Sequence, residues 1–192
     1  MSKISSDFYL SSDVVQVGYE LLGKRICSAI DGKYCSAIIT ETEAYAGIED
    51  KASHAYGGKR TKRTEIMYAK GGVAYVYLCY GIHFLFNVVT NLSGIPHAVL
   101  VRGVRAESGK ETMLNRRGIT SLRSDSLNGP GKVSRALGIT KAHNAVDLNG
   151  DQIWLETTDI QIDAKNSMAS KRIGIDYAEE DALLPYRFSI IE

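Results

Sequence analysis

The stretch KRICSAIDGKYCSAIITETEAY, residues 24–45, predicts a β-hairpin around which the rest of the chain is organised. Two segments of strand composition, 24–30 and 33–42, flank the dipeptide Asp31-Gly32. Asp-Gly is a two-residue signal for a type I′ turn, whose twist matches that of the flanking strands. We therefore expect an antiparallel pair of strands, and we expect Glu43 to sit at the far end of the second one.

Acidic and aromatic side chains alternate with smaller ones at the end of this hairpin. Successive side chains of a strand point to opposite faces. One face should carry Ile39, Glu41, Glu43 and Tyr45, and the other Thr40, Thr42 and Ala44. A carboxylate on a strand end is held rigidly, which suits a catalytic group, although an arbitrary Glu is usually exposed and idle. Glu43 is our first candidate, and Glu41 is its rival.

The residues that follow add an imidazole, a basic run and more aromatic rings. His54 comes nine residues after Tyr45, and the loop then carries the cations of segment 59–63. Segments 73–80 and 82–89 have strand composition with Gly81 between them, which predicts a second hairpin with Tyr80 at its tip. A carboxylate, aromatic rings, an imidazole and a basic run together suggest chemistry on a nucleic-acid base.

The remaining pattern predicts an α+β fold with a mainly antiparallel, curved sheet, a protruding β-hairpin and short surrounding helices. The 192 residues, 44% of them hydrophobic, suit a single domain over residues 1–192. A helix capped by Asp13 should span roughly 11–23. Further helices are expected at 107–117 and 132–137, and further strands at 95–102, 152–157, 160–163 and 185–191.

Composition limits the class of protein and its compartment. No apolar run reaches membrane-spanning length and the N-terminus lacks a signal-peptide pattern, so we expect a soluble, cytoplasmic protein. The three cysteines form no Cys-x-x-Cys pair. The net charge is only +1, but segments 51–70 and 101–141 are strongly basic while the flanking segments are acidic or neutral. This distribution predicts one basic face.

Several motifs together resemble a known family. Glu-Thr-Glu-Ala-Tyr-Ala-Gly at 41–47, Ser-His-Ala at 53–55 and Tyr-Val-Tyr-Leu-Cys-Tyr-Gly-Ile-His at 75–83 come first. Asn-Gly-Pro-Gly-Lys at 128–132, Arg-Ile-Gly-Ile at 172–175 and Pro-Tyr-Arg-Phe at 185–188 follow. In this order and spacing they are similar to the alkyladenine (3-methyladenine) DNA glycosylase family, and the resemblance spans nearly the whole chain.

The resemblance implies a base-excision-repair DNA glycosylase that acts on damaged purines. It would flip the purine from double-stranded DNA and hydrolyse the N-glycosidic bond with water activated by a carboxylate, leaving an abasic site. Glu43 would be the general base, and Arg102 would lie near the catalytic water and the target phosphate. The flipped base would be held by Tyr45, His54, Tyr77 and Asn87. The substrates implied are of the 3-methyladenine, 7-methylguanine, hypoxanthine and ethenoadenine class.

The resemblance also implies which residues bind DNA. Tyr80 would be a wedge pushed into the minor groove, and Lys59, Thr61 and Met67 would contact DNA. Lys62 and the pairs 69–70 and 105–106 depart from the family pattern, and these departures touch DNA-contact loops rather than the base pocket. We expect a monomer that needs no metal or organic cofactor and binds no membrane.

Other interpretations of the same residues remain open. His54 and Tyr77 could be an ordinary surface residue and a core residue, Tyr80 could pack beneath its turn, and Arg102 could form a surface salt bridge. A non-enzymatic nucleic-acid-binding domain would bind bases without needing Glu43. A carbohydrate-active hydrolase would instead use Glu41 and Glu43 as a carboxylate pair.

Overall fold

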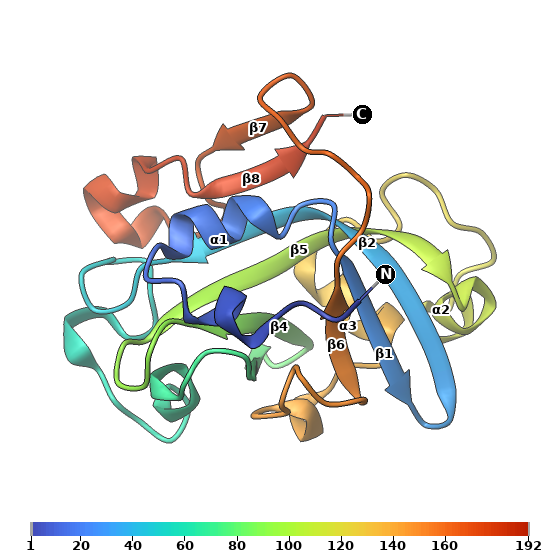
Figure 1. Ribbon diagram of the computed structural model, residues 1–192, viewed down its shortest axis with the longest axis horizontal. Coiled ribbons are helices and arrows are strands. Elements are labelled where there is room, and N and C mark those ends of the chain that lie inside the picture. Colours follow the sequence, from blue (N-terminus) through green and yellow to red (C-terminus); the bar gives the residue numbers. More distant parts are fainter. Residues whose placement is uncertain (1, 192) are drawn as a thin grey trace.

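The computed structural model describes residues 2–191 and has the predicted α+β architecture with a curled antiparallel sheet (Figure 1). The α-helices are α1 (Val14–Glu20), α2 (Lys110–Arg117) and α3 (Pro130–Leu137). The strands are β1 (Arg25–Ile30), β2 (Lys33–Tyr45), β3 (Ala74–Cys79), β4 (His83–Thr90), β5 (His97–Ser108), β6 (Ile153–Glu156), β7 (Ser167–Ser170) and β8 (Arg187–Ile190). Short 3₁₀ helices lie at Ser6–Leu10, Tyr56–Gly58, Glu65–Tyr68, Lys141–His143 and Asp176–Leu183.

The first hairpin forms as predicted. β1 pairs with β2 from Arg25 opposite Ile38 to Ile30 opposite Lys33. Both residues of the connecting turn are left-handed, with φ of 55° at Asp31 and 66° at Gly32. A type I′ turn requires positive φ at both central positions, which Asp and Gly tolerate.

β2 is the central strand of the molecule because it has neighbours on both sides along most of its length. The sheet order is β3-β4-β5-β2-β1-β6, and the last part of β2 (Glu41 to Glu43) also pairs with β8. Strand β5 follows the other edge of β2 from Ser36 to Tyr45, with register shifts around Glu41. Glu43 is therefore clamped by backbone hydrogen bonds between two strands, which fixes the position of its side chain.

A close backbone approach accompanies these register shifts. A Cβ atom added at Gly103 of β5 would lie 3.0 Å from Cβ of Glu41 and 3.1 Å from Oγ1 of Thr40. Only a glycine lets β5 pass so near to β2 at this point without a shift of the neighbouring atoms. The bulged pairing bends the sheet beside the two acidic residues.

Helices cover both faces of the sheet (Figure 1). On one face α1 packs on β2, where the hydroxyl of Thr42 donates to the carbonyl of Gly18 at 2.6 Å. On the other face α3 packs on β4 and β5, and the hydroxyl of Ser28 donates to the carbonyl of Leu137 at 2.8 Å. Thr42 therefore faces α1, as the alternation predicted, and the odd-numbered residues Glu41 to Tyr45 face the side of α3.

The second hairpin also forms as predicted. β3 and β4 pair from Ala74 opposite Val88 to Cys79 opposite His83. Tyr80 occupies the turn with φ of 49° and is 89% exposed. The exposed tip position predicted for Tyr80 is confirmed and the alternative, in which it packs beneath its turn, is wrong, since almost the whole side chain faces solvent.

Several other elements differ from the prediction. The first helix is capped by the side chain of Asp13 but spans only Val14–Glu20. Segment 160–163 forms no strand; Ile160 and Ile162 lie close to Gly23, although Ile160 is 37% exposed. β7 was not predicted, and β5 runs six residues past Arg102, which delays the start of α2 to Lys110.

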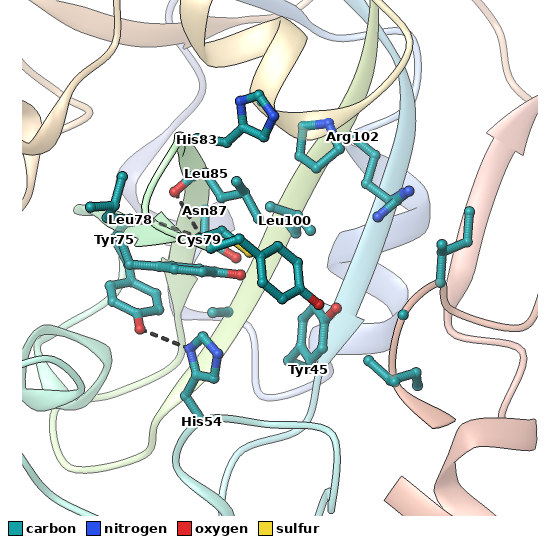
Figure 2. A pocket seen from close by; sticks show the side chains of 18 of the residues that line it. Tyr45, His54, Tyr75, Leu78, Cys79, His83, Leu85, Asn87, Leu100 and Arg102 are labelled. Atoms are coloured by element: carbon teal, nitrogen blue, oxygen red, sulfur yellow. Dashed lines mark hydrogen bonds between the residues drawn. The ribbon is translucent and has the colours of Figure 1, made fainter. Parts of the chain in front are cut away.

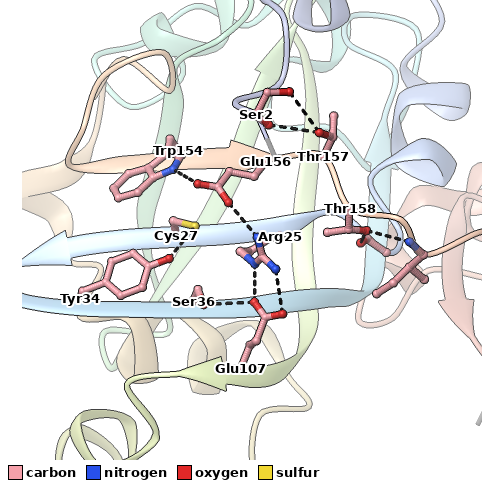
Figure 3. A network of polar contacts seen from close by, with 12 residues as sticks. Ser2, Arg25, Cys27, Tyr34, Ser36, Glu107, Trp154, Glu156, Thr157 and Thr158 are labelled. Carbon is pink, nitrogen blue, oxygen red and sulfur yellow. Dashed lines mark hydrogen bonds and ion pairs between the residues drawn. The ribbon is translucent and has the colours of Figure 1, made fainter.

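A polar network lies on the face of β1 and β2 opposite to Ser28 (Figure 3). The guanidinium of Arg25 pairs with the carboxylates of Glu107 and Glu156, and the indole of Trp154 donates to Glu156 at 2.8 Å. These contacts join β1 to β5 and β6, so they stabilise the edge of the sheet away from the candidate site.

Candidate functional site

A cavity of about 790 Å³ opens beside the end of β2 (Figure 2). Its walls come from β2, the β3–β4 hairpin, the start of α3 at 129–132 and the C-terminal loop at 173–177. Ligand pockets for small molecules and bases are typically about 300–1,000 Å³. Seven of the residues predicted for the site line this cavity: Tyr45, His54, Met67, Tyr77, Tyr80, Asn87 and Arg102.

Glu43 lies directly behind this wall and has no exposed area. Its Oε2 accepts a hydrogen bond from the Tyr45 hydroxyl at 2.8 Å, and its Oε1 accepts one from the backbone N–H of Ile173 at 2.7 Å. Arg102 donates from Nη1 to Oε2 at 3.4 Å. All three donors line the cavity, so they hold the carboxylate in one orientation against it.

Burial raises the pKa of Glu43 above its ordinary value, and the neighbouring donors oppose that rise. The charge of Arg102 and the hydrogen bonds from Ile173 and Tyr45 favour the ionised form. The carboxyl is thus desolvated yet supplied with donors, the environment in which a carboxylate is made more basic without being left unpaired.

Glu41 has a different environment although it shares this face of β2. Its Oε1 accepts from Arg187 at 2.9 Å and from Nε of Arg102 at 3.3 Å. It lines a second, smaller cavity of about 400 Å³ and does not line the first. Arg102 therefore bridges the two carboxylates, and Glu41 is neutralised by a second arginine.

Tyr45 forms one wall of the main cavity, and it is backed by a buried ion pair. The guanidinium of Arg172 lies 4.9 Å from the centroid of the Tyr45 ring and pairs with Asp50. Asp50 in turn accepts from the backbone N–H groups of Ala46 and Ala52, both at 3.0 Å. This pair ties the loop after β2 to the C-terminal segment and fixes the ring.

The opposite wall is an aromatic cluster of His54, Tyr75 and Tyr77. The His54 ring lies edge to face with Tyr77, with centroids 4.7 Å apart. Its Nδ1 is 2.9 Å from the Tyr75 hydroxyl (Figure 2). Burial, with help from the charges of Arg63 and Lys59, lowers the pKa of His54 to about 4, so the ring is neutral near pH 7.

Asn87 projects from β4 into the cavity and is 3% exposed. Its amide Nδ2 donates to the carbonyls of Tyr75 at 3.1 Å and Leu85 at 3.4 Å. These bonds satisfy the buried donor and fix the side chain as part of the pocket floor.

The three residues predicted to contact DNA lie in the loop after β2. Lys59 and Thr61 are exposed and do not line the cavity. Met67 is only 2% exposed; it packs in a small hydrophobic cluster with Tyr68 and Tyr75 and lines the cavity. Its position is that of a pocket-wall residue rather than a surface contact.

Three site residues were not singled out from the sequence. Arg63 lines the cavity from within the basic run, Arg172 supports Tyr45, and the backbone N–H of Ile173 binds Glu43. Their signals were weak: Arg63 was one cation among several in a polar loop, and the Arg-Ile-Gly-Ile motif was quoted without a role. The two basic segments do meet, since Arg63 from the first and Arg102, Arg117 and Lys132 from the second line one cavity.

Residues 2–191 contain neither a cluster of metal-binding side chains nor a membrane-spanning helix. No group of three or more His, Cys, Asp or Glu side chains there could hold a metal ion. No helix in that range is long and apolar enough to cross a membrane.

Comparison with known proteins identifies the family. A family model for methylpurine-DNA glycosylase matches residues 7–192. The chain belongs to the methylpurine-DNA glycosylase family. This membership confirms the resemblance drawn from the motifs and the prediction that the protein is a DNA glycosylase.

Relatives in this family match almost from end to end. A protein of Chlamydia felis named "Putative 3-methyladenine DNA glycosylase" is 45% identical over 186 residues, covering 96% of this chain and 94% of the relative. A protein of the same name from Desulfitobacterium hafniense is 45% identical over 199 residues, covering 98% and 95%. Another from Bacillus mycoides is 43% identical over 188 residues, covering 94% and 92%.

Proposed function

We propose that this glycosylase flips an alkylated or deaminated purine out of double-stranded DNA and hydrolyses its N-glycosidic bond, leaving an abasic site. The observation that carries the proposal is Glu43, a fully buried carboxylate held by Tyr45, Ile173 and Arg102 at the wall of an aromatic cavity. Hydrolysis at C1′ needs a base for the attacking water and negative charge near an oxocarbenium-like sugar, and Glu43 supplies both.

The cavity suits a single flipped purine. Extrusion of a base costs a few kcal/mol, and stacking on aromatic rings returns about 1–3 kcal/mol per base. Tyr45 on one side and Tyr77 with His54 on the other provide the rings. No hydrogen bond from the backbone N–H of His54 is formed within residues 2–191, so this donor is free to read the edge of the base.

Tyr80 would act as the wedge. It is 89% exposed on a two-stranded support, and its neighbour Ile82 is 71% exposed. Apolar side chains at such a tip can enter the minor groove and fill the gap that a flipped nucleotide leaves. Lys59 and Thr61, which are exposed, would then contact the DNA backbone.

Asn87 would set the shape limit of the pocket. Because its amide is fixed by the carbonyls of Tyr75 and Leu85, it cannot move aside for an exocyclic amine on the purine. Arg102, already bound to Glu43, would orient the water and the target phosphate. The carboxylate has no exposed area in the free protein, so water and sugar must be admitted on its cavity side when DNA binds.

A single-turnover excision assay tests the proposal. Duplex oligonucleotides with one hypoxanthine, ethenoadenine or 3-methyladenine would be incubated with wild-type protein and with Glu43→Gln. We expect base release by the wild type and a loss of about 10²–10⁴-fold in the variant, with DNA binding kept. Glu49→Gln, which alters an exposed Glu six residues away, is the matched control.

The alternative is a nucleic-acid-binding domain without catalysis. It predicts that wild-type protein binds lesion-containing DNA and releases no base. The carboxylate-pair hydrolase has less support, because Glu41 is bound by Arg102 and Arg187 and faces a different cavity.

A further inference from the structure

Arg63 occupies the base cavity with a contact on each side. Its Nη2 donates to Nε2 of His54 at 3.1 Å, and its guanidinium carbon lies 4.7 Å from the centroid of the Tyr77 ring. Both neighbours are residues proposed to hold the flipped base. No ion pair to an Asp or Glu holds this guanidinium within residues 2–191.

The contact with Arg63 fixes the tautomer of His54. An arginine can only donate, so Nε2 must present its lone pair. The ring proton is then on Nδ1, where it is donated to the Tyr75 hydroxyl at 2.9 Å. Both ring nitrogens of His54 are therefore occupied. Besides the backbone N–H of His54, the remaining N–H groups of the Arg63 guanidinium, which has five donors in total, can donate to a base at this wall.

The wall of the cavity is positively charged. Its wall carries four cationic side chains, Arg63, Arg102, Arg117 and Lys132, and no Asp or Glu within the described residues. Glu43 lies behind the wall and already faces Arg102. Arg63 is itself exposed, and a positively charged purine beside it is repelled by the like charge.

We propose, on the basis of the glycosylase function above, that Arg63 determines the choice of damaged base. It favours neutral purines with free acceptors at O6 and N7, such as hypoxanthine, over purines made cationic by N-methylation, such as 7-methylguanine. Arginine recognises an O6/N7 edge with two parallel hydrogen bonds. Methylation at N7 removes one acceptor and adds a positive charge.

The same guanidinium assists departure of a neutral base. As the C1′–N9 bond breaks, its electron pair leaves with the purine, water bonds to C1′, and the proton of that water passes to Glu43 and ends on the released base. A neutral purine gains negative charge in this step, which Arg63 stabilises. A cationic purine leaves as a neutral molecule and gains nothing from Arg63.

The test compares single-turnover release of hypoxanthine and 7-methylguanine by wild type, Arg63→Met and Arg63→Lys. In Arg63→Met we expect the hypoxanthine-to-7-methylguanine rate ratio to fall at least about tenfold, mainly through slower hypoxanthine release. Arg63→Lys keeps the charge but loses the two parallel N–H donors of the guanidinium, so its hypoxanthine-to-7-methylguanine rate ratio should be intermediate. Arg60→Met is the matched control, because Arg60 is in the same loop but pairs with Glu65 and lies over Tyr68.

A binding measurement isolates the charge and needs no Arg63 variant. In the Glu43→Gln background, DNA with 7-methylguanine should bind more weakly than DNA with its neutral isostere 7-methyl-7-deazaguanine. Equal binding of the two, an unchanged rate ratio in folded Arg63→Met, or an equal fall of both rates would overturn the role of Arg63. Absence of excision by wild type on every lesion would instead refute the glycosylase function itself.

Discussion

Glu41 and Glu43 are two residues apart on one strand and both bind Arg102, yet they have opposite surroundings. Glu41 is held by a second arginine, Arg187, and lines a small polar cavity. Glu43 has no exposed area and is held by a tyrosine hydroxyl and a backbone N–H behind an aromatic cavity. The first is neutralised by charge, and the second is desolvated and hydrogen-bonded.

The difference shows that environment rather than residue type separates a structural carboxylate from a reactive one. Glu41 lies between two guanidiniums, which balance its charge. A desolvated carboxylate with a raised pKa is a stronger base. Both environments occur on one face of β2, because the odd-numbered residues of this strand meet different neighbours as the sheet bends.

The largest expected effect is on catalysis. Glu43→Gln should lower single-turnover excision by about 10²–10⁴-fold, whereas Glu41→Gln should lower it by no more than about tenfold, through a less well held Arg102. Both variants would be measured on the same hypoxanthine duplex. Equal losses would contradict the separate roles of Glu41 and Glu43 and would support a catalytic carboxylate pair.

The second effect is on stability, and its sign should differ between the two carboxylates. Glu41→Gln leaves two arginines short of a partner and should cost about 1–3 kcal/mol. Glu43→Gln removes the desolvation of a buried charge and should stabilise the fold near neutral pH. Urea denaturation of both variants and the wild type checks both signs. A destabilised Glu43→Gln at pH 8 would contradict our account of its burial.

The pH dependence follows from the raised pKa of Glu43. In the unfolded chain this group ionises near pH 4.3, and in the native protein it ionises at a higher pH. Stability of the wild type is therefore lost as pH rises through the native pKa, because the unfolded state has already released its proton. The advantage of Glu43→Gln should grow as the pH rises above about 4.3 and should level off once Glu43 is ionised in the native protein.

Local signals in the sequence were enough to predict the parts of the site that lie on the two hairpins. The Asp31-Gly32 turn fixed the register of β2, and strand alternation placed Glu43 and Tyr45 on the cavity side. The tip position of Tyr80 followed from Gly81. These features depend on turn chemistry and a period of two, which a short window contains.

The supporting residues could not be predicted because their partners are far away in the chain. Arg172 meets Asp50 across 122 positions, and Ile173 meets Glu43 across 130. Arg63 was visible only as one member of a basic run, and the structure alone placed it on His54. The bulged pairing at Gly103 likewise depends on how β5 crosses β2.

A smaller effect is expected at Tyr45, which serves Glu43 and not Glu41. Tyr45→Phe keeps the stacking ring and removes the hydroxyl that donates to Oε2 of Glu43. That hydrogen bond lowers the pKa of Glu43, so its loss should raise the pKa. The acid limb of the pH–rate profile should move to higher pH, with excision at pH 7 reduced about three- to tenfold. An unmoved acid limb would contradict Glu43 as the titrating base.

The smallest effect is expected at Arg187, which reaches Glu41 and not Glu43. Arg187→Met should change excision by less than about twofold and stability by about 1 kcal/mol or less, as for a partly exposed ion pair. Arg102 would remain bound to both carboxylates and would keep Glu43 in place. A large loss of activity, measured in the same single-turnover assay, would mean that the charges around Glu41 affect the general base Glu43 through Arg102. The two carboxylates would then act as one coupled unit rather than as two separate environments.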